Sequence, residues 1–309
     1  MGNKTSPMEF ILSDLAEKPI LQMLCFPVFF TIYLIGSVGN MMIITIILKA
    51  PHLWTPMYFF IVNLAGLDMC YISTIVPNLL VNSLRQRKTI SYEGCVVQLY
   101  VFLMMASTES CLLAAMSYDR YVAICHPLRY TVIINRDVCL QLNVSSWIIG
   151  IIYSSIHTSN TFQLHFCRSN VIDHFFCDIP PLLKIACSDT RFNKIMVYGV
   201  GAVLILPCFP LIIVSYIYII HDVLRIPSAT GRRKTFSTCV SHLMAVGLFY
   251  LTGSSVYLQP LSTTTTQQQD KVSAVFYTIL VPMANPIIYS LRNKDLKESI
   301  SKMMTTKFH

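Results

Sequence analysis

Two carboxylates lie deep inside apolar stretches of this 309-residue sequence. Asp68 stands in the stretch 57–81 and Glu109 in the stretch 96–124. Burying either charge in hydrocarbon costs on the order of several kcal/mol, so each is a candidate for function. Asn40 and Asn285 lie at comparable depth in the first and last apolar stretches. Together the four side chains could hold a hydrated cation such as sodium, share a proton, or form a polar network that only joins helices.

A charged pair, Asp119-Arg120, ends the third apolar stretch. Arg120 could pair with Asp119 in one state and meet a partner protein in another, or the pair could simply lie at a membrane surface. Arg232, Arg233 and Lys234 fall on the same side of the predicted membrane. They would form a basic rim that faces an acidic or dipolar surface of a partner, although such a run is more often only a solvated turn.

The last apolar stretch carries two prolines, Pro282 and Pro286, one helical turn apart. Each removes a backbone donor and bends the helix, leaving carbonyls that Asn285 or water can satisfy. This weak point predicts a hinge that moves Tyr289, with a static kink as the alternative.

The composition requires a membrane around these residues. Hydrophobic residues make up 54% of the chain and charged residues 12%, with a mean hydropathy of +0.58. Soluble domains carry roughly 25% charged residues, so this chain could not cover a soluble surface. The net charge of +8 comes from short clusters between apolar stretches, which indicates loops at an anionic lipid surface and not nucleic-acid binding.

Enzyme and transporter interpretations find little support. No HExxH, GxSxG or phosphate-binding glycine loop occurs. Cys167, Cys177 and Cys187 stand ten residues apart, which does not match zinc-ligand spacing. The apolar stretches do not divide into the repeated halves that are typical of transporters. We expect no enzyme activity and no cofactor beyond the possible sodium ion.

Seven stretches are long enough to cross a bilayer as helices, since about 20 apolar residues are needed. The sequence therefore predicts an all-α membrane protein with a seven-helix bundle over 23–290, an N-terminal tail over 1–22, and a cytoplasmic amphipathic helix and tail over 291–309. The predicted spans are 23–48, 57–81, 96–124, 141–160, 196–224, 236–259 and 271–290.

Seven spans place the two ends of the chain on opposite sides of the membrane. Four cysteines, Cys95, Cys167, Cys177 and Cys187, fall on the N-terminal side, which suggests two disulfides and an oxidising exterior. A glycosylation sequon at Asn3 shares that side, and no cleavable signal peptide is visible. We expect an extracellular N-terminus in the plasma membrane.

Five long motifs in order give this chain a resemblance to a known family. They are PMYFF at 56–60, MSYDRYVAICHPLRY at 116–130, SYIYI at 215–219, RRKTFSTCVSHL at 232–243 and PMANPIIYSLRN at 282–293. The chain resembles the rhodopsin-like (class A) G-protein-coupled receptors and, among them, the olfactory receptors. HFFCD at 174–178 in the long three-cysteine loop is similar to the tetrapod-type (class II) subgroup.

The resemblance implies a role for several residues. It implies the disulfides Cys95–Cys177 and Cys167–Cys187, and an odorant receptor of olfactory cilia that raises cyclic AMP through a stimulatory, olfactory-type heterotrimeric G protein. It implies a sodium-type site and an inner switch against the G protein. The residues of the sodium-type site are Asn40, Asp68, Glu109 and Asn285, and those of the switch are Asp119, Arg120, Tyr121, Tyr216 and Tyr289.

The ligand pocket is expected between the outer halves of helices three, five, six and seven. Helix three has no carboxylate between Val96 and Thr108, so no buried anion from this helix would meet an amine. A few hydroxyls in an apolar wall favour a small neutral volatile such as an ester, ketone, aldehyde or alcohol. The candidate residues are Phe102, Leu103, Ala106, Ser107, Val203, Leu206, Tyr250, Ser254, Tyr257, Val275 and Thr278, each of which could instead pack only between helices.

Two departures from the family pattern bear on the pocket and on activation. Ser117 stands where the family usually has Ala, and Leu251 where it usually has Gly, which could stiffen helix six or narrow the pocket. Helix six has no Trp, so Tyr250 becomes the candidate for the pocket floor. The alternative functions are a ligand-gated channel, whose seven spans would be inverted, or another seven-span receptor.

Overall fold

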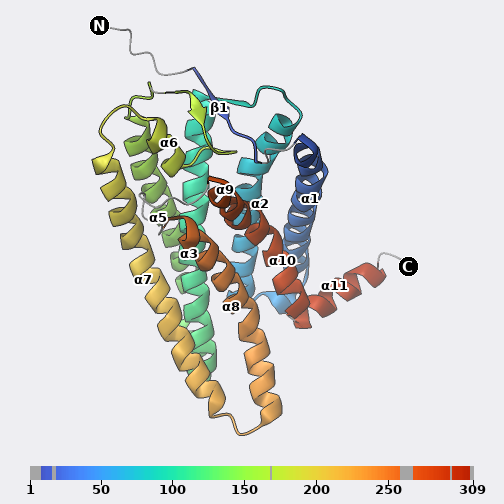
Figure 1. The fold of residues 1–309 in the computed structure, drawn as a ribbon. Coiled ribbons are helices and arrows are strands. Elements are labelled where there is room, and N and C mark those ends of the chain that lie inside the picture. Colours follow the sequence, from blue (N-terminus) through green and yellow to red (C-terminus); the bar gives the residue numbers. More distant parts are fainter. Residues whose placement is uncertain (1–7, 16–18, 168, 258–266, 293, 307–309) are drawn as a thin grey trace.

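The computed structural model describes residues 8–15, 19–167, 169–257, 267–292 and 294–306 (Figure 1). Long helices run side by side through the molecule, and the expected all-α bundle is confirmed. They are α1 (Pro19–Lys49), α2 (Pro56–Ser83), α3 (Tyr92–Cys125), α5 (Arg136–Phe162), α7 (Arg191–Leu224), α8 (Ala229–Tyr257) and a last helix made of α9 (Gln267–Val275), the π-helical turn η3 (Phe276–Leu280) and α10 (Val281–Arg292).

Six of these helices have the length and hydropathy needed to cross a membrane, counting the described residues only. The remaining one, α8, carries a shorter apolar stretch, Cys239–Ser254, beneath a polar first turn. Its helix begins at Ala229, inside the segment 225–235 that lies between the predicted spans 196–224 and 236–259. Backbone hydrogen bonding therefore continues past the apolar residues, so hydropathy alone gave a late start for this helix.

Local chemistry sets where the spans begin. The Ser91 hydroxyl accepts a 3.0 Å hydrogen bond from the Gly94 amide and caps α3, and the Asn135 side chain accepts one of 2.9 Å from the Val138 amide at the start of α5. Pro56 occupies the first turn of α2, where its missing N–H costs nothing. Short helices complete the bundle: α4 (Tyr130–Ile133), α6 (Ile179–Ile185), α11 (Lys294–Thr306), η1 (Pro51–Leu53) and η2 (Pro127–Arg129).

Helix α3 is the central element of the bundle. It contacts α2, α5, α7 and α8, and it is the most buried of the candidate spans. Its first residues lie at the end of the bundle that carries β1 and α6, and its last residues lie at the opposite end, toward the α7–α8 turn (Figure 1). We call these the disulfide end and the Arg120 end.

A small sheet covers the disulfide end, which the sequence did not predict. Strand β1 (Glu9–Leu12) lies between β2 (Thr89–Ser91), which is antiparallel to it, and β3 (Val171–Ile172), which is parallel. The predicted tail 1–22 therefore contains a strand and the start of α1. Phe10 is fully buried, with its ring centroid 6.0 Å from that of Tyr92 and 5.5 Å from that of Phe166. Burial of this ring holds the N-terminal segment onto the loops.

The π turn η3 lies directly before Pro282. Because Pro282 has no N–H, it cannot form the α-helical hydrogen bond to the Thr278 carbonyl. Just before it, the Val281 amide bonds to the Phe276 carbonyl, where an α-helix would use the Tyr277 carbonyl. The Asn40 side chain donates a 3.3 Å hydrogen bond to the Pro282 carbonyl. The sequence predicted a weak point at these prolines, but it predicted that Asn285 or water, and not Asn40, would bond to the freed carbonyls.

Candidate functional site

The loop after β3 is buried in the disulfide end of the bundle. The disulfide Cys95–Cys177 ties it to the first turn of α3, and the Cys177 amide donates a 3.0 Å hydrogen bond to the Gln98 side chain. The second disulfide, Cys167–Cys187, closes the same loop on itself. Both pairs are those that the resemblance implied. The loop is thus fixed against α3.

Asp178, the residue after Cys177, is a buried carboxylate that the sequence analysis missed. Its side chain is 2% exposed, and Oδ2 accepts a 3.1 Å hydrogen bond from the Tyr277 hydroxyl. Oδ1 accepts a 2.7 Å bond from the Ile179 amide and so caps α6. Helix three indeed offers no carboxylate at this level, but the loop supplies one. Its adjacency to a disulfide cysteine was the signal that could have found it.

Aromatic rings gather around Phe102 beneath this carboxylate. The Phe102 ring centroid lies 5.7 Å from that of Tyr71, 5.3 Å from that of Phe176 and 6.0 Å from that of Tyr277. We call these four residues and Asp178 the Phe102 cluster. It joins α2, α3, the loop and the last helix in an apolar setting with one carboxylate and two hydroxyls, which suits a mostly apolar ligand with one polar group.

Most of the remaining candidates on α3 and the last helix are buried near the cluster. Leu103 and Ser107 are buried and Ala106 is half-buried. The Ser107 hydroxyl donates to the Leu103 carbonyl at 2.6 Å, and Thr278, which is fully buried, donates to the Ala274 carbonyl at 2.7 Å. Both hydroxyls donate their hydrogen bond within their own helix, so each can only accept a further hydrogen bond.

Tyr250 connects α8 to α3. Its hydroxyl lies 2.8 Å from that of Ser110, and its ring centroid is 5.1 Å from that of Phe209 on α7. Because Tyr250 contacts both neighbours, movement of α8 would break or reshape both contacts. On the same helix, half-buried Ser254 donates a 3.1 Å bond to the Leu251 carbonyl, and on the last helix Val275 is half-buried.

Two candidates on α7 do not join these residues. Val203 and Leu206 are 72% and 66% exposed and face away from the bundle, which corrects the helical phase that was assumed for them. The reason is that α7 is apolar around its whole circumference, so the pattern gave no phase. Leu251 is 73% exposed and so does not narrow the pocket. The side chain of Tyr257 lies outside the described residues, as does Asn3.

Among the buried polar residues, Asp68 and Asn285 are hydrogen-bonded to each other, while Asn40 bonds elsewhere. The Asn285 side chain donates a 3.0 Å hydrogen bond to Oδ2 of Asp68. Asn40 does not join them but donates to the Gly36 and Pro282 carbonyls at 3.0 and 3.3 Å. Glu109, 1% exposed, interacts electrostatically with Asp68. The depth expected for these residues is therefore observed, and three of the four are brought together.

Unpaired oxygens at this pair bear on the sodium hypothesis. Asp68 Oδ1, Asn285 Oδ1 and the Tyr289 hydroxyl are buried without a hydrogen-bond partner among the described residues. Hard cations prefer oxygen ligands of this kind, so the residues fit the ion chemically. Across the described ranges no three His, Cys, Asp or Glu side chains form a metal cluster, so amide and hydroxyl oxygens would have to complete the coordination.

At the Arg120 end, the structure does not pair Asp119 with Arg120. Oδ1 of Asp119 accepts a 2.7 Å hydrogen bond from Tyr130 on α4, and Arg120 has no carboxylate within 4.0 Å in the described part of the chain. Arg120 instead lies within electrostatic reach of Tyr216 and Tyr289. Three of the candidate switch residues, Arg120, Tyr216 and Tyr289, are thus brought together, while Asp119 is held by Tyr130, a neighbour that the sequence analysis did not name.

Further contacts fix this end of the bundle. The Tyr216 hydroxyl lies 2.6 Å from Nδ1 of His242, joining α7 to α8. The Tyr121 hydroxyl lies 3.1 Å from Nε2 of His126, just beyond the end of α3. Separation of α7 from α8 would break the first contact and uncover the side chains around Arg120.

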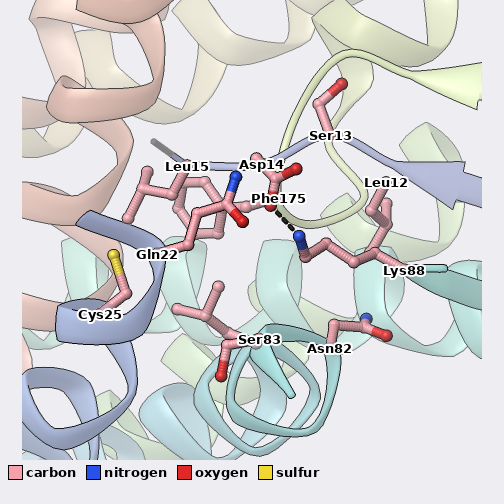
Figure 2. Close-up of a pocket in the computed structure, with 11 residues that line it drawn as sticks. Leu12, Ser13, Asp14, Leu15, Gln22, Cys25, Asn82, Ser83, Lys88 and Phe175 are labelled. Atoms are coloured by element: carbon pink, nitrogen blue, oxygen red, sulfur yellow. Dashed lines mark hydrogen bonds and ion pairs between the residues drawn. The ribbon is translucent and has the colours of Figure 1, made fainter. Parts of the chain in front are cut away.

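A small cavity lies beside the Phe102 cluster and not within it. Figure 2 shows it between the N-terminal segment and the ends of α1 and α2, with the ion pair of Lys88 and Asp14 at its edge. Its volume of about 30 Å³ has room for about one or two water molecules. Phe175 lines it and adjoins Phe176 of the cluster, so the N-terminal segment is part of the lid over the cluster.

Comparisons with known proteins place the whole chain beside one group. The family model described as olfactory receptor matches residues 29–307. Human olfactory receptor 5I1 is 48% identical over 305 residues, covering 99% of this chain and 97% of that protein. The dog olfactory receptor-like protein OLF1 is 48% identical over 306 residues, with coverage of 99% and 98%, and human olfactory receptor 8G1 is 47% identical over 302 residues, with coverage of 98% and 97%.

Proposed function

The chain belongs to the olfactory receptor family, and on that premise we propose that it binds a small neutral volatile at the Phe102 cluster and activates a stimulatory G protein at the Arg120 end. The family consists of odorant-binding, G-protein-coupled receptors and not of enzymes, and this chain is a multi-pass membrane protein. The particular ligand, the type of G protein and the rise in cyclic AMP are the proposed part.

The observation that carries the ligand proposal is the Asp178–Tyr277 hydrogen bond above the Phe102 ring. The carboxylate already accepts two hydrogen bonds, from Tyr277 and from the Ile179 amide. A ligand hydroxyl can donate to this carboxylate, and a ligand carbonyl can accept from Tyr277 if that hydroxyl turns. Esters, ketones, aldehydes and alcohols therefore fit, with their carbon skeleton against the aromatic rings.

Ligand binding would act on the G protein through α3 and α8. Phe102 and Ser110 lie on the same helix as Arg120, and Ser110 contacts Tyr250 of α8. A ligand that binds better when α8 moves outward shifts the population toward that state. Outward movement opens the contact of Tyr216 with His242 and exposes Arg120 to the G protein.

We also propose the orientation, the cell location and the ion. The N-terminus is extracellular, which fits the two disulfides at that end, and the receptor acts in olfactory cilia. A sodium ion bound by Asp68, Glu109 and Asn285 would neutralise buried charge in the resting state. Glycan mapping at Asn3 tests the orientation, since an inverted channel would leave that asparagine unmodified.

The decisive experiment is a cyclic-AMP assay of a volatile panel in cells that carry the olfactory G protein. Phe102→Ala should weaken the response to every agonist, because it empties the centre of the cluster. Ile148→Ala, at an outward-facing residue of α5, is the control and should leave the response unchanged. Equal responses from the two variants at equal surface expression would remove the cluster from the proposal. An aliphatic amine in the panel tests whether Asp178 accepts a cation instead.

A further inference from the structure

A shallow groove opens on the surface between α2 and α3, just below β2. Its volume is about 440 Å³, and Val97, 60% exposed, forms the middle of its α3 wall. The groove lies away from the Phe102 cluster, on the side of α3 that faces out of the bundle. Its lining residues are Thr74 and Asn78 on α2, Ile90 in β2, and Glu93, Gly94, Val97, Gln98 and Val101 on α3.

The deeper polar side chains of the groove are already hydrogen-bonded. The Thr74 hydroxyl donates to the Cys70 carbonyl at 2.8 Å. The Gln98 side chain donates to the Thr74 carbonyl and accepts from the Cys177 amide, both at 3.0 Å. What these residues show to the groove is therefore mainly their apolar surface, next to the two valines.

Free polar groups remain only at the end of the groove nearest the sheet. The Asn78 side-chain oxygen accepts from Asn82, while its Nδ2 makes no hydrogen bond with the described residues. Glu93, in the first turn of α3, forms no ion pair in the part of the chain that the structure describes. The groove thus has one free donor and one free acceptor at its mouth, a combination that a single hydroxyl group can satisfy.

We propose that this groove binds a membrane sterol, with the sterol hydroxyl between Asn78 and Glu93 and the ring system against Val97 and Val101. The eight residue-to-residue steps from Glu93 to Val101 rise about 12 Å along the helix, less than half of the roughly 30 Å hydrocarbon core, so the ligand lies within one leaflet. A rigid ring system also loses little conformational freedom when it settles on a shallow wall.

The charge of the lining residues favours a sterol over a phospholipid as the occupant of the groove. The lining contains one carboxylate and no Lys, Arg or His, so a lipid phosphate at the mouth would face Glu93 without a cation to neutralise it. An uncharged hydroxyl meets no such repulsion. That the leaflet is the outer one rests on the extracellular N-terminus proposed above.

The test uses the full-length receptor in lipid nanodiscs with a photoreactive cholesterol analogue and mapping of the labelled peptides. We expect saturable labelling within residues 74–101. Val97→Trp fills the groove and Glu93→Ala removes the acceptor, and each should lower labelling roughly tenfold, the loss of about 1.4 kcal/mol of binding free energy. Ile148→Trp, at a residue of α5 that is 51% exposed, is the matched control and should label like the wild type.

Each other outcome overturns the proposal. Labelling that excess phosphatidylcholine displaces as well as cholesterol does would make the groove a phospholipid site. Labelling that does not saturate, maps elsewhere, or is unchanged in Val97→Trp would mean that no sterol site exists there. The odorant response of the same variants is recorded separately, so a receptor without any odorant response fails the proposed function while its labelling still tests the groove.

Discussion

The Tyr277 hydroxyl donates a 3.1 Å hydrogen bond to Oδ2 of Asp178 and so joins the last helix to the loop held by the Cys95–Cys177 disulfide. Tyr277 lies in the π turn η3, one helical turn before Pro282. The bond therefore connects the disulfide-held loop to the part of the last helix whose hydrogen bonding is already interrupted. A ligand that competes for this bond would act on the bundle at its weak point.

Tyr277→Phe should weaken and reshape the odorant response. The change leaves the ring in contact with Phe102 but removes one donor from a buried carboxylate, which costs about 1–3 kcal/mol. Ligands with a hydroxyl should lose less than those with only a carbonyl, because a hydroxyl can replace the lost donor. Dose-response curves for matched alcohol and ketone pairs measure this. Tyr100→Phe, a half-buried tyrosine on α3, is the control, and identical shifts for both ligand types would refute the assignment.

His174 should make the loop sensitive to acid. Burial lowers the pKa of His174 from its ordinary 6.5 to about 3, helped by nearby Lys271 and Lys184 and opposed by Asp173. Because the pKa is depressed in the folded state, the unfolded state binds more protons between these values. Above about pH 6.5 the ring is neutral in both states and does not change the free energy of unfolding. Below that pH the free energy of unfolding falls, by about 2 kcal/mol at pH 5.

The measurement is the thermal stability of the purified receptor at pH 7.5 and pH 5. His174→Gln cannot take up a proton, so its loss of Tm between the two pH values should be smaller than that of the wild type. The His174 ring centroid lies 4.7 Å from those of Phe175 and Phe176, so a lower Tm at pH 7.5 is also expected from lost packing. Only the pH dependence decides: equal losses in both proteins would show that His174 is not the group responsible.

Lys271→Met should loosen the lid over the Phe102 cluster. The buried Lys271 ammonium lies 3.3 Å from Asp173 of the loop and donates a 2.9 Å hydrogen bond to the Asp14 carbonyl of the N-terminal segment. Its removal takes away the ion pair with Asp173 and the donor to the Asp14 carbonyl. Amide hydrogen exchange of Glu9–Leu12 should become faster. Arg191→Met breaks an exposed 3.8 Å pair with Asp189 and should change little; if it has the same effect on exchange, the lid assignment is wrong.

The helices could be predicted from sequence because a bilayer demands long apolar stretches, and this chain has them at α1, α2, α3, α5, α7 and the last helix. The caps at Ser91 and Asn135 also obey local chemistry that the sequence carries. By contrast, β1 has four residues, Glu9–Leu12, and is stable only through partners from two distant loops. No local pattern of that length can predict such a strand.

The candidate site divides in the same way. Phe102 and Tyr250 could be named because their helices and depth followed from the apolar pattern. Val203 and Leu206 could not be placed, since a helix that is apolar all round has no preferred face in its sequence. Asp178 and its partner Tyr277 needed both the disulfide and the path of the loop, which are tertiary facts.

Tyr130→Phe should reduce signalling without reducing ligand binding. Burial, and then the neighbouring Asp119, raise the pKa of Tyr130, so its hydroxyl keeps the proton that it donates to Asp119. Without this donor, Asp119 is free to pair with the adjacent Arg120 and to hold it away from the G protein. We expect a lower maximal cyclic-AMP response at unchanged surface expression, and Arg120→Ala should abolish the response. Tyr118→Phe, at a half-buried tyrosine on α3, is the control and should signal normally. A response that rises in Tyr130→Phe, or that survives in Arg120→Ala, would mean that the pair lies at the membrane surface without acting as a switch.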